Sequence, residues 1–184
     1  KTTTTINLAA ALSELKKKVL IIDLDPQGNA STGLGVDVED RELSTYEFLV
    51  EGVPLEKVAM ETEISGLSIV PATIDLSSAD IDLISNEKRS HLLHEALRKK
   101  KENKQKYDYI LIDCPPSLNI LTVNAMVASH SVLIPLQSEF FALEGLSQLL
   151  LTVKEVRQNA NENLRVEGIV LTMFDGRNNL SKQV

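Results

Sequence analysis

Two short apolar runs that each end in an aspartate place the strongest constraint on the fold of this chain. One run spans Val19–Asp23 and reads VLIID, and the other spans Tyr107–Asp113 and ends in ILID. A continuous apolar run of this length is typical of a strand that is buried on both faces of a parallel sheet. Ligands of open α/β sheets gather at the carboxyl ends of the strands. We therefore expect both aspartates at a binding edge.

Helical segments alternate with five strand-like runs, which predicts an α/β fold with a doubly wound, mainly parallel sheet and helices on both faces. The expected strands are Val19–Asp23, Leu67–Pro71, Tyr107–Asp113, Ser131–Leu136 and Arg165–Thr172. The expected helices are Thr2–Lys17, Thr45–Leu49, Ser77–Ile84, Ser90–Asn103, Ile120–Ala128 and Leu143–Ala160. In the first helix, the apolar residues at positions 8, 11, 12 and 15 follow helical spacing. Residues 28–44 contain three glycines and are expected to form a loop.

Composition narrows the class of protein. A length of 184 residues fits one domain, and a hydrophobic content of 43% is sufficient for a core. The net charge of −7 argues against a strongly basic nucleic-acid binder but leaves room for a local basic patch. The single cysteine, Cys114, excludes an internal disulfide and fits a reducing cytosol. No apolar run reaches the roughly 20 residues of a membrane span, so no membrane partner is expected.

The first residues of the chain match the end of a phosphate-binding Walker A loop, which reads G-x-x-x-x-G-K-S/T. Lys1 and Thr2 supply the lysine and the hydroxyl residue, whereas no glycines stand before them. In such a loop, Lys1 would contact the β- and γ-phosphates and the Thr2 hydroxyl would bind Mg²⁺. The alternative is an ordinary threonine-rich helix start, because threonine is a good N-cap.

Asp113 matches a Walker B aspartate, which follows an apolar strand and holds Mg²⁺. The alternative is that Asp113 caps the turn into the next helix. Pro115 and Pro116 stiffen the loop after it, and a loop at this place is suited to act as a switch. Cys114 is interpreted as a small packing residue and not as a nucleophile, since the sequence offers it no fitting base.

Six strings along the chain carry a specific resemblance. They are Lys1-Thr2-Thr3-Thr4, Asp23-Leu24-Asp25-Pro26-Gln27-Gly28-Asn29, Val70-Pro71-Ala72, Asp113-Cys114-Pro115-Pro116-Ser117, Pro135-Leu136-Gln137 and Phe141-Ala142-Leu143-Glu144-Gly145-Leu146. With these strings the chain closely resembles the ParA/Soj chromosome- and plasmid-partitioning ATPases. That family belongs to the deviant Walker A class of P-loop proteins, with MinD and the nitrogenase iron protein as relatives.

The resemblance implies a role for each matching residue. Lys1 and Asp25 would be catalytic: Lys1 on the phosphates, and Asp25 positioning or activating the attacking water. Thr2, Asp23 and Asp113 would surround Mg²⁺, and Thr3 would support the α-phosphate. The resemblance also suggests that Met173 lies beside the adenine of ATP. Arg177 falls where partitioning ATPases carry a DNA-contacting arginine, although an exposed loop arginine is an equal alternative.

At the level of the protein, the resemblance implies a Mg²⁺-dependent ATPase that forms an ATP-dependent homodimer. The dimer would bind DNA without sequence preference in the cytoplasm, on the nucleoid, and a ParB-type partner would stimulate its slow ATP hydrolysis. The alternatives are a MinD-like positioning ATPase at a membrane and a non-catalytic fragment. Amidoligase-like and synthetase-like relatives share the P-loop core but are not expected to carry the last two strings.

The resemblance further implies that residues 1–184 form a single P-loop domain that starts inside Walker A and lacks the C-terminal part. The strand that precedes Walker A is central in such folds. Without it, strands Val19–Asp23 and Tyr107–Asp113 are expected to flank a gap with unpaired backbone groups, which is costly in a buried position.

Overall fold

The computed structural model describes residues 1–79, 86, 88–98, 106–137, 142–174 and 177. The chain forms two compact units, Lys1–Ala125 and Met126–Val184, which are described separately below. The prediction of one incomplete domain over residues 1–184 stays a prediction. No helix among the described residues combines the length and the apolar character needed to cross a membrane.

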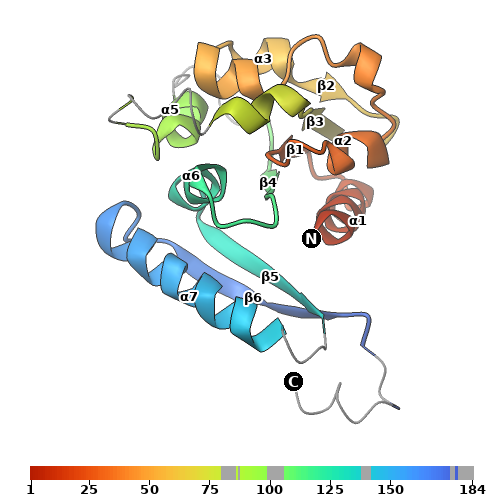
Figure 1. The fold of residues 1–184 in the computed structure, drawn as a ribbon. Helices are drawn as coiled ribbons and strands as arrows, with labels where there is room; N and C mark the ends of the chain where they lie inside the picture. The colour runs from red at the N-terminus through yellow and green to blue at the C-terminus, as the bar shows by residue number, and fades with distance from the viewer. Residues whose placement is uncertain (80–85, 87, 99–105, 138–141, 175–176, 178–184) are drawn as a thin grey trace. The chain divides into compact units, whose positions relative to one another are not determined.

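The first unit is built on a four-stranded sheet with the strand order β2-β3-β1-β4 (Figure 1). Its strands are β1 (Val19–Asp23), β2 (Met60–Glu61), β3 (Leu67–Val70) and β4 (Tyr109–Asp113). β1 pairs in parallel with both β3 and β4, and the short β2 joins β3 in the antiparallel sense. All five residues of β1 are buried, as expected for a strand covered on both faces.

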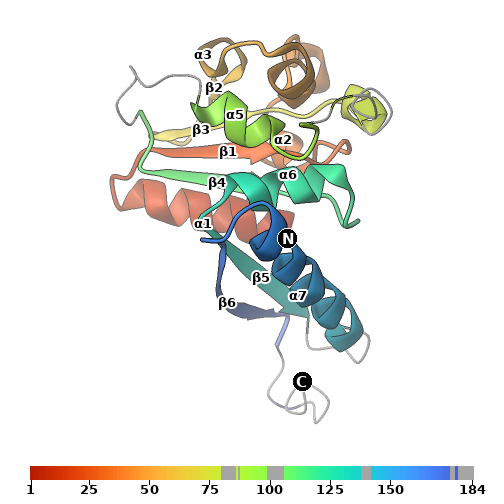
Figure 2. The ribbon, with the colours of Figure 1, turned by 90° about the vertical axis from the view of Figure 1, so that its left-hand side faces the viewer.

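Helices cover both faces of this sheet (Figure 1). α1 (Thr2–Glu14) and the short α2 (Asn29–Gly33) lie on one face, and Figure 2 shows α1 running alongside β1 and β4. The π-helical turn η2 (Glu47–Glu51) and α5 (Leu92–Arg98) lie on the other face. The described residues of this unit also include the short helices η1 (Val38–Asp40), α3 (Leu55–Val58) and η3 (Ile74–Ser78).

A core cluster joins α1, α2 and the sheet. Ala9 of α1 is fully buried in a cluster with Val19 and Ile21 of β1, and Ile6 and Leu12 are partly buried against this cluster. This face agrees with the predicted one at Leu12 but not at Leu8 and Leu15, which are 36% and 71% exposed. The fully packed positions of the helix are thus its small residues, Ala9 and Ser13.

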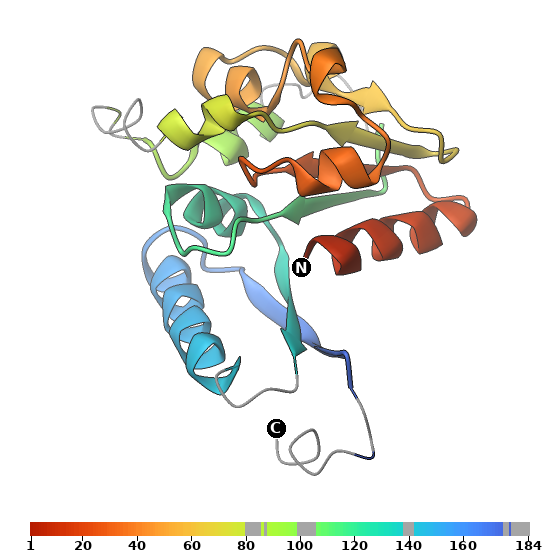
Figure 3. The same cartoon turned by 45° about the vertical axis from the view of Figure 1, so that its right-hand side comes forward.

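The second unit contains a two-stranded parallel sheet and one long helix (Figure 3). β5 (Ser131–Gln137) and β6 (Arg165–Thr172) pair over their whole lengths, with a register irregularity between Val132 and Leu133. α7 (Ala142–Asn159) connects the two strands, since parallel neighbours need a crossover. Before β5, α6 (Ile120–Ala128) ends where Asn161 Nδ2 donates to the carbonyls of Met126 and Ser129, at 3.0 and 2.8 Å.

The predicted α/β class with a mainly parallel sheet is confirmed, as are the bounds of Val19–Asp23, Arg165–Thr172 and Ile120–Ala128. The prediction of a gap between the first and third expected strands is wrong, because β1 and β4 pair directly from Val19↔Tyr109 to Asp23↔Asp113. The expected loop 28–44 contains α2 and η1, and the expected helix Thr45–Leu49 coincides in part with η2. Parts of the expected helices Ser77–Ile84 and Ser90–Asn103 lie outside the described residues.

Candidate functional site

Two carboxylates meet at the carboxyl end of the parallel sheet. Asp23 and Asp113 are the last residues of β1 and β4, and they are register partners. The backbone N–H of Leu24 donates to the Asp113 carbonyl at 2.8 Å and fixes the two strand ends together. Asp23 is fully buried and Asp113 is 1% exposed. Two buried like charges this close favour a cation or hydrogen-bond donors around them.

Asp23 is satisfied by donors of the chain itself. Its Oδ2 accepts hydrogen bonds from Ser31 Oγ at 2.8 Å and from the Ser31 backbone N–H at 3.0 Å, while Oδ1 accepts from the Asp25 N–H at 3.1 Å. Burial raises the pKa of Asp23 above its ordinary 3.8, these hydrogen bonds oppose the shift, and the negative charge of Asp113 adds to it. Asp23 therefore organises the loop that leads from β1 into α2.

Asp25 is held in place by its own loop. Its Oδ1 accepts a hydrogen bond from the Gln27 N–H at 3.0 Å, and its carbonyl accepts one from the Gly28 N–H at 2.8 Å. The side chain is nearly buried, with 8% of the residue exposed. Its second carboxylate oxygen accepts no hydrogen bond from the described part of the chain. Asp25 therefore has one oxygen fixed by its loop and one available for a water molecule.

Asp113 has one oxygen paired and one oxygen unpaired. Thr5 Oγ1 of α1 donates to Asp113 Oδ1 at 3.1 Å, whereas Asp113 Oδ2 is buried and has no hydrogen-bond partner among the described residues. A buried carboxylate oxygen without a donor is rare in native proteins and points to a cation or an ordered water. Mg²⁺ prefers oxygen ligands of this kind. The unpaired oxygen thus fits the predicted magnesium role of Asp113.

The Lys1 side chain contacts the loop that follows Asp113. Its Nζ donates a hydrogen bond to the carbonyl of Pro115 at 3.1 Å. Burial raises the pKa of the Cys114 thiol to about 12; the Asp113 carboxylate adds to the rise, the Lys1 ammonium opposes it, and Asp23 and Asp25 add further. The charges of Lys1, Asp23, Asp25 and Asp113 are therefore all near enough to Cys114 to act on the pKa of its thiol. A thiol with this pKa stays protonated near neutral pH, so Cys114 is not a nucleophile there.

The threonines at the start of α1 take different positions. Thr2 begins the helix and is partly buried, whereas Thr3 is exposed. Neither hydroxyl makes a hydrogen bond within the described residues, so the predicted contacts of Thr2 and Thr3 with Mg²⁺ and phosphate stay predictions. Sequence reasoning missed Thr5, whose only signal was its position one helical turn after Lys1 on the face that meets β4.

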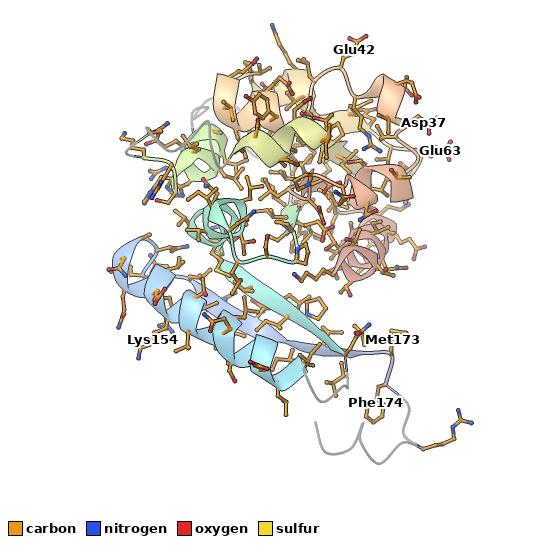
Figure 4. The ribbon with its side chains drawn as sticks, viewed as in Figure 1. Asp37, Glu42, Glu63, Lys154, Met173 and Phe174 are labelled. Carbon is orange, nitrogen blue, oxygen red and sulfur yellow. The ribbon has the colours of Figure 1, made fainter. Side chains whose placement is uncertain are left out.

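Met173 and Arg177 belong to the second unit. Met173 directly follows β6 and is 82% exposed (Figure 4). Gln137 Nε2 donates a hydrogen bond to its sulfur at 3.1 Å. Arg177 is exposed. A surface hollow of about 290 Å³ also lies in this unit, lined by Lys154, Arg157, Gln158 and Glu162. None of the predicted site residues lines this hollow. The predicted contacts of Met173 with adenine and of Arg177 with DNA remain predictions.

Among the described residues, no three His, Cys, Asp or Glu side chains are placed around one point. At nucleotide sites Mg²⁺ generally binds to one or two carboxylates and substrate phosphates and keeps several waters.

Comparison with known proteins assigns the family. The AAA domain family AAA_31 matches residues 1–166. The chain is 51% identical to the chromosome partitioning protein ParA of Caulobacter vibrioides over 184 residues, which are 100% of this chain and 68% of that protein. The chain belongs to the ParA/Soj family of partitioning ATPases. It is also 49% identical to the sporulation initiation inhibitor protein Soj of Bacillus subtilis, over 100% of this chain and 72% of that protein.

A solved structure that resembles this ParA/Soj chain contains a nucleotide. The cobyrinic acid a,c-diamide synthase of Mycobacterium smegmatis with a bound ATP analogue and magnesium matches with a TM-score of 0.91 and 37% identity. The match covers 99% of this chain and 71% of that chain. A nucleotide and Mg²⁺ are therefore the ligands to test at the carboxyl ends of β1 and β4.

Proposed function

We propose that this ParA/Soj chain binds ATP with Mg²⁺ at the carboxyl ends of β1 and β4 and hydrolyses it slowly to ADP and phosphate. The observation that carries the proposal is the buried, unpartnered Oδ2 of Asp113. It lies among the charges of Lys1, Asp23 and Asp25 that gather around Cys114. The family membership supports the choice of ATP as the ligand.

Each residue has a defined task in this mechanism. Lys1 neutralises phosphate charge, and its release from the Pro115 carbonyl couples nucleotide binding to the loop after Asp113. Bound Mg²⁺ supplies further charge neutralisation for the β- and γ-phosphates. Asp113 and Thr2 would hold the metal, and Thr3 would contact the α-phosphate. Asp25 orients the attacking water by positioning it, since its Oδ1 is fixed by the Gln27 N–H and its other oxygen faces the water.

Asp23 was expected in the magnesium shell, and the structure suggests a more specific role for it. Both of its oxygens already accept hydrogen bonds, from Ser31 and from the Asp25 backbone. We place Asp23 behind Asp25, where it fixes the loop that presents the Asp25 carboxylate. Direct coordination of Mg²⁺ by Asp23 would require Ser31 to give up its two bonds.

The test of the ATPase proposal is the Asp25→Ala variant of the full-length protein. We expect ATP binding to remain, measured by the fluorescence of a labelled ATP, while steady-state release of phosphate is abolished. Asp37→Ala is the matched control, since Asp37 is an exposed carboxylate of the same unit (Figure 4). Hydrolysis that persists in Asp25→Ala would show that another residue positions the water.

At the level of the cell, we propose a DNA-segregation protein whose ATP-bound homodimer binds DNA without sequence preference. A ParB-type partner would then reset it, with Arg177 contacting DNA and Met173 lying beside the adenine. DNA binding by backbone contacts weakens steeply with salt. A gel-shift assay with ATP on plasmid DNA, at 50 and 200 mM salt, is therefore expected to show strong loss of binding. Binding to anionic liposomes in place of DNA would support the membrane-positioning alternative.

A second candidate function is ATP-dependent amide synthesis. It is favoured by the TM-score of 0.91 with the cobyrinic acid a,c-diamide synthase. The curated partitioning relatives share more identity, at 49–51%, than the 37% shared with that structure. Addition of cobyrinic acid and glutamine should leave ADP release unchanged if the partitioning assignment is right, and should accelerate it if the second candidate is right.

A further inference from the structure

The contact between α1 and β4 brings together two residues that lie far apart in the sequence. Thr5 Oγ1 donates to Asp113 Oδ1 at 3.1 Å, across a sequence separation of 108 residues. The same hydroxyl lies 3.3 Å from the carbonyl oxygen of Lys1, one turn earlier in the helix. A hydroxyl has one proton, so these two acceptors compete for it. The carboxylate is charged and closer, and charge-assisted hydrogen bonds are the stronger class.

The Thr5 hydroxyl is the donor that orients the Asp113 carboxylate. Among the described residues, Asp113 Oδ1 accepts from Thr5 alone, and Oδ2 accepts from none. With Oδ1 held toward α1, rotation of the carboxylate is restricted and Oδ2 is kept free. The register pairing with Asp23 and the bond from the Leu24 N–H fix the backbone of Asp113, so the remaining freedom is in its side chain.

We propose that Thr5 is a positioning residue for magnesium: by holding Oδ1 of Asp113, it keeps Oδ2 available as the ligand of a nucleotide-bound Mg²⁺. This inference rests on the proposed ATP and Mg²⁺ site and adds to it a residue outside the Walker strings. It has a precedent in principle, because groups that hydrogen-bond to a metal ligand tune affinity and typically change it by about 10–100-fold when removed.

The experiment compares Thr5→Val, which keeps the shape and removes the hydroxyl, with Thr5→Ser, which keeps the hydroxyl. The full-length protein is titrated with Mg²⁺ at fixed labelled ATP, and the half-saturating Mg²⁺ concentration is read from fluorescence. We expect Thr5→Val to raise this concentration by about 10-fold or more and Thr5→Ser to remain near the wild-type value. Binding of labelled ATP in EDTA should not change in either variant.

The matched control is Thr4→Val. Thr4 is the preceding residue of α1, is also partly buried, and its hydroxyl bonds to no described residue. The Thr4→Val variant should leave the half-saturating Mg²⁺ concentration unchanged. Thermal unfolding of each variant separates loss of stability from loss of metal affinity, and Thr5→Ala provides a second hydroxyl deletion should Thr5→Val not fold.

The outcomes separate this inference from the proposed function. A wild-type protein that binds no labelled ATP, with or without Mg²⁺, would overturn the proposed function. A wild type that requires Mg²⁺, together with Thr5 deletions that require the same Mg²⁺ concentration, would overturn the role of Thr5 alone. A purely structural role would lower the unfolding temperature without moving the magnesium midpoint, and this result would also reject the inference.

Discussion

The loop after β1 depends on one glycine and one buried arginine, and replacing Gly28 with alanine tests that dependence. Gly28 has a φ of +62°, in the left-handed region that disfavours residues with a Cβ. A Cβ built there would lie 2.3 Å from Nη1 of Arg41 and 3.1 Å from the carbonyl oxygen of Ala72. The first distance is impossible, so the guanidinium must move.

Arg41 cannot move at low cost. It is 7% exposed, and its guanidinium donates to Ala72 O at 3.0 Å, to Thr32 Oγ1 at 2.8 Å and to Val36 O at 2.7 Å. Left-handed strain costs about 1–2 kcal/mol, and a hydrogen bond of a charged group contributes about 1.5–3 kcal/mol. With the loss of the bond to Ala72 as a minimum, we expect Gly28→Ala to lower the free energy of unfolding by about 2.5–5 kcal/mol.

Urea denaturation followed by circular dichroism measures this change. Gly35→Ala is the matched control, because Gly35 has a φ of +78° and a Cβ there would meet nothing within 4 Å. It should lose only the strain energy of about 1–2 kcal/mol. The double variant Gly28→Ala/Arg41→Ala should be less destabilised than the sum of the two single variants, since residues in contact are not additive. Equal losses for Gly28→Ala and Gly35→Ala would refute the reasoning.

Two further predictions concern hydrogen bonds to the carboxylates of Asp23 and Glu47. Ser31→Ala removes the hydroxyl that donates to Asp23 and accepts from the Ala72 N–H, and should lower the free energy of unfolding by about 1–3 kcal/mol. Burial raises the pKa of Asp23 above 3.8, so the contribution of Asp23 to the free energy of unfolding is largest in acid and is lost as pH rises above that value. The Ser31 hydrogen bonds favour the charged form of Asp23, so the loss caused by Ser31→Ala should be smaller in acid, where Asp23 is protonated. Ser13→Ala removes a buried bond within its own helix and should show no such pH dependence. For Glu47, burial alone raises the pKa, but donors from Ser44 outweigh it and hold the pKa below 4.5. That stabilisation is present above pH 4.5 and is lost as pH falls below it. Glu47→Gln should flatten this acid-side loss in urea titrations, and an unchanged slope would contradict a stabilising role for the hydrogen bonds from the Ser44 N–H and Oγ to Glu47 Oε2, each 2.7 Å long.

Much of the site could be predicted from the sequence, because its parts are local. Strand Val19–Asp23 was predicted with its observed bounds, since a short apolar run that ends in a carboxylate has few other structures open to it. Asp113 was placed at a binding edge for the same reason, and parallel pairing with β1 puts it there. The roles of Lys1 and Asp25 were predicted from the sequence strings that resemble the ParA/Soj family. These predictions needed only the order of residues along the chain.

Other parts required contacts between distant segments. The spacing of apolar residues predicted that Leu8 and Leu15 of α1 would be buried. In the structure both are exposed, and the small residue Ala9 is buried against the sheet in their place. The gap expected beside strand β1 is absent because β4 pairs with it along its whole length. Sequence spacing carries no information on which strand becomes the neighbour.

The sequence alone determined the fold class, the family and the residue types gathered at the strand ends, because these follow from local patterns of hydrophobicity and from specific strings. Only the tertiary structure decided what each carboxylate does. It gave Asp23 two donors from Ser31, and it left Asp113 Oδ2 without a donor from the part of the chain that the structure describes. It also brought Thr5 against Asp113 across 108 residues. The physical reason is that hydrogen bonds depend on distance in space, which the chain fixes only when its helix and strands pack together.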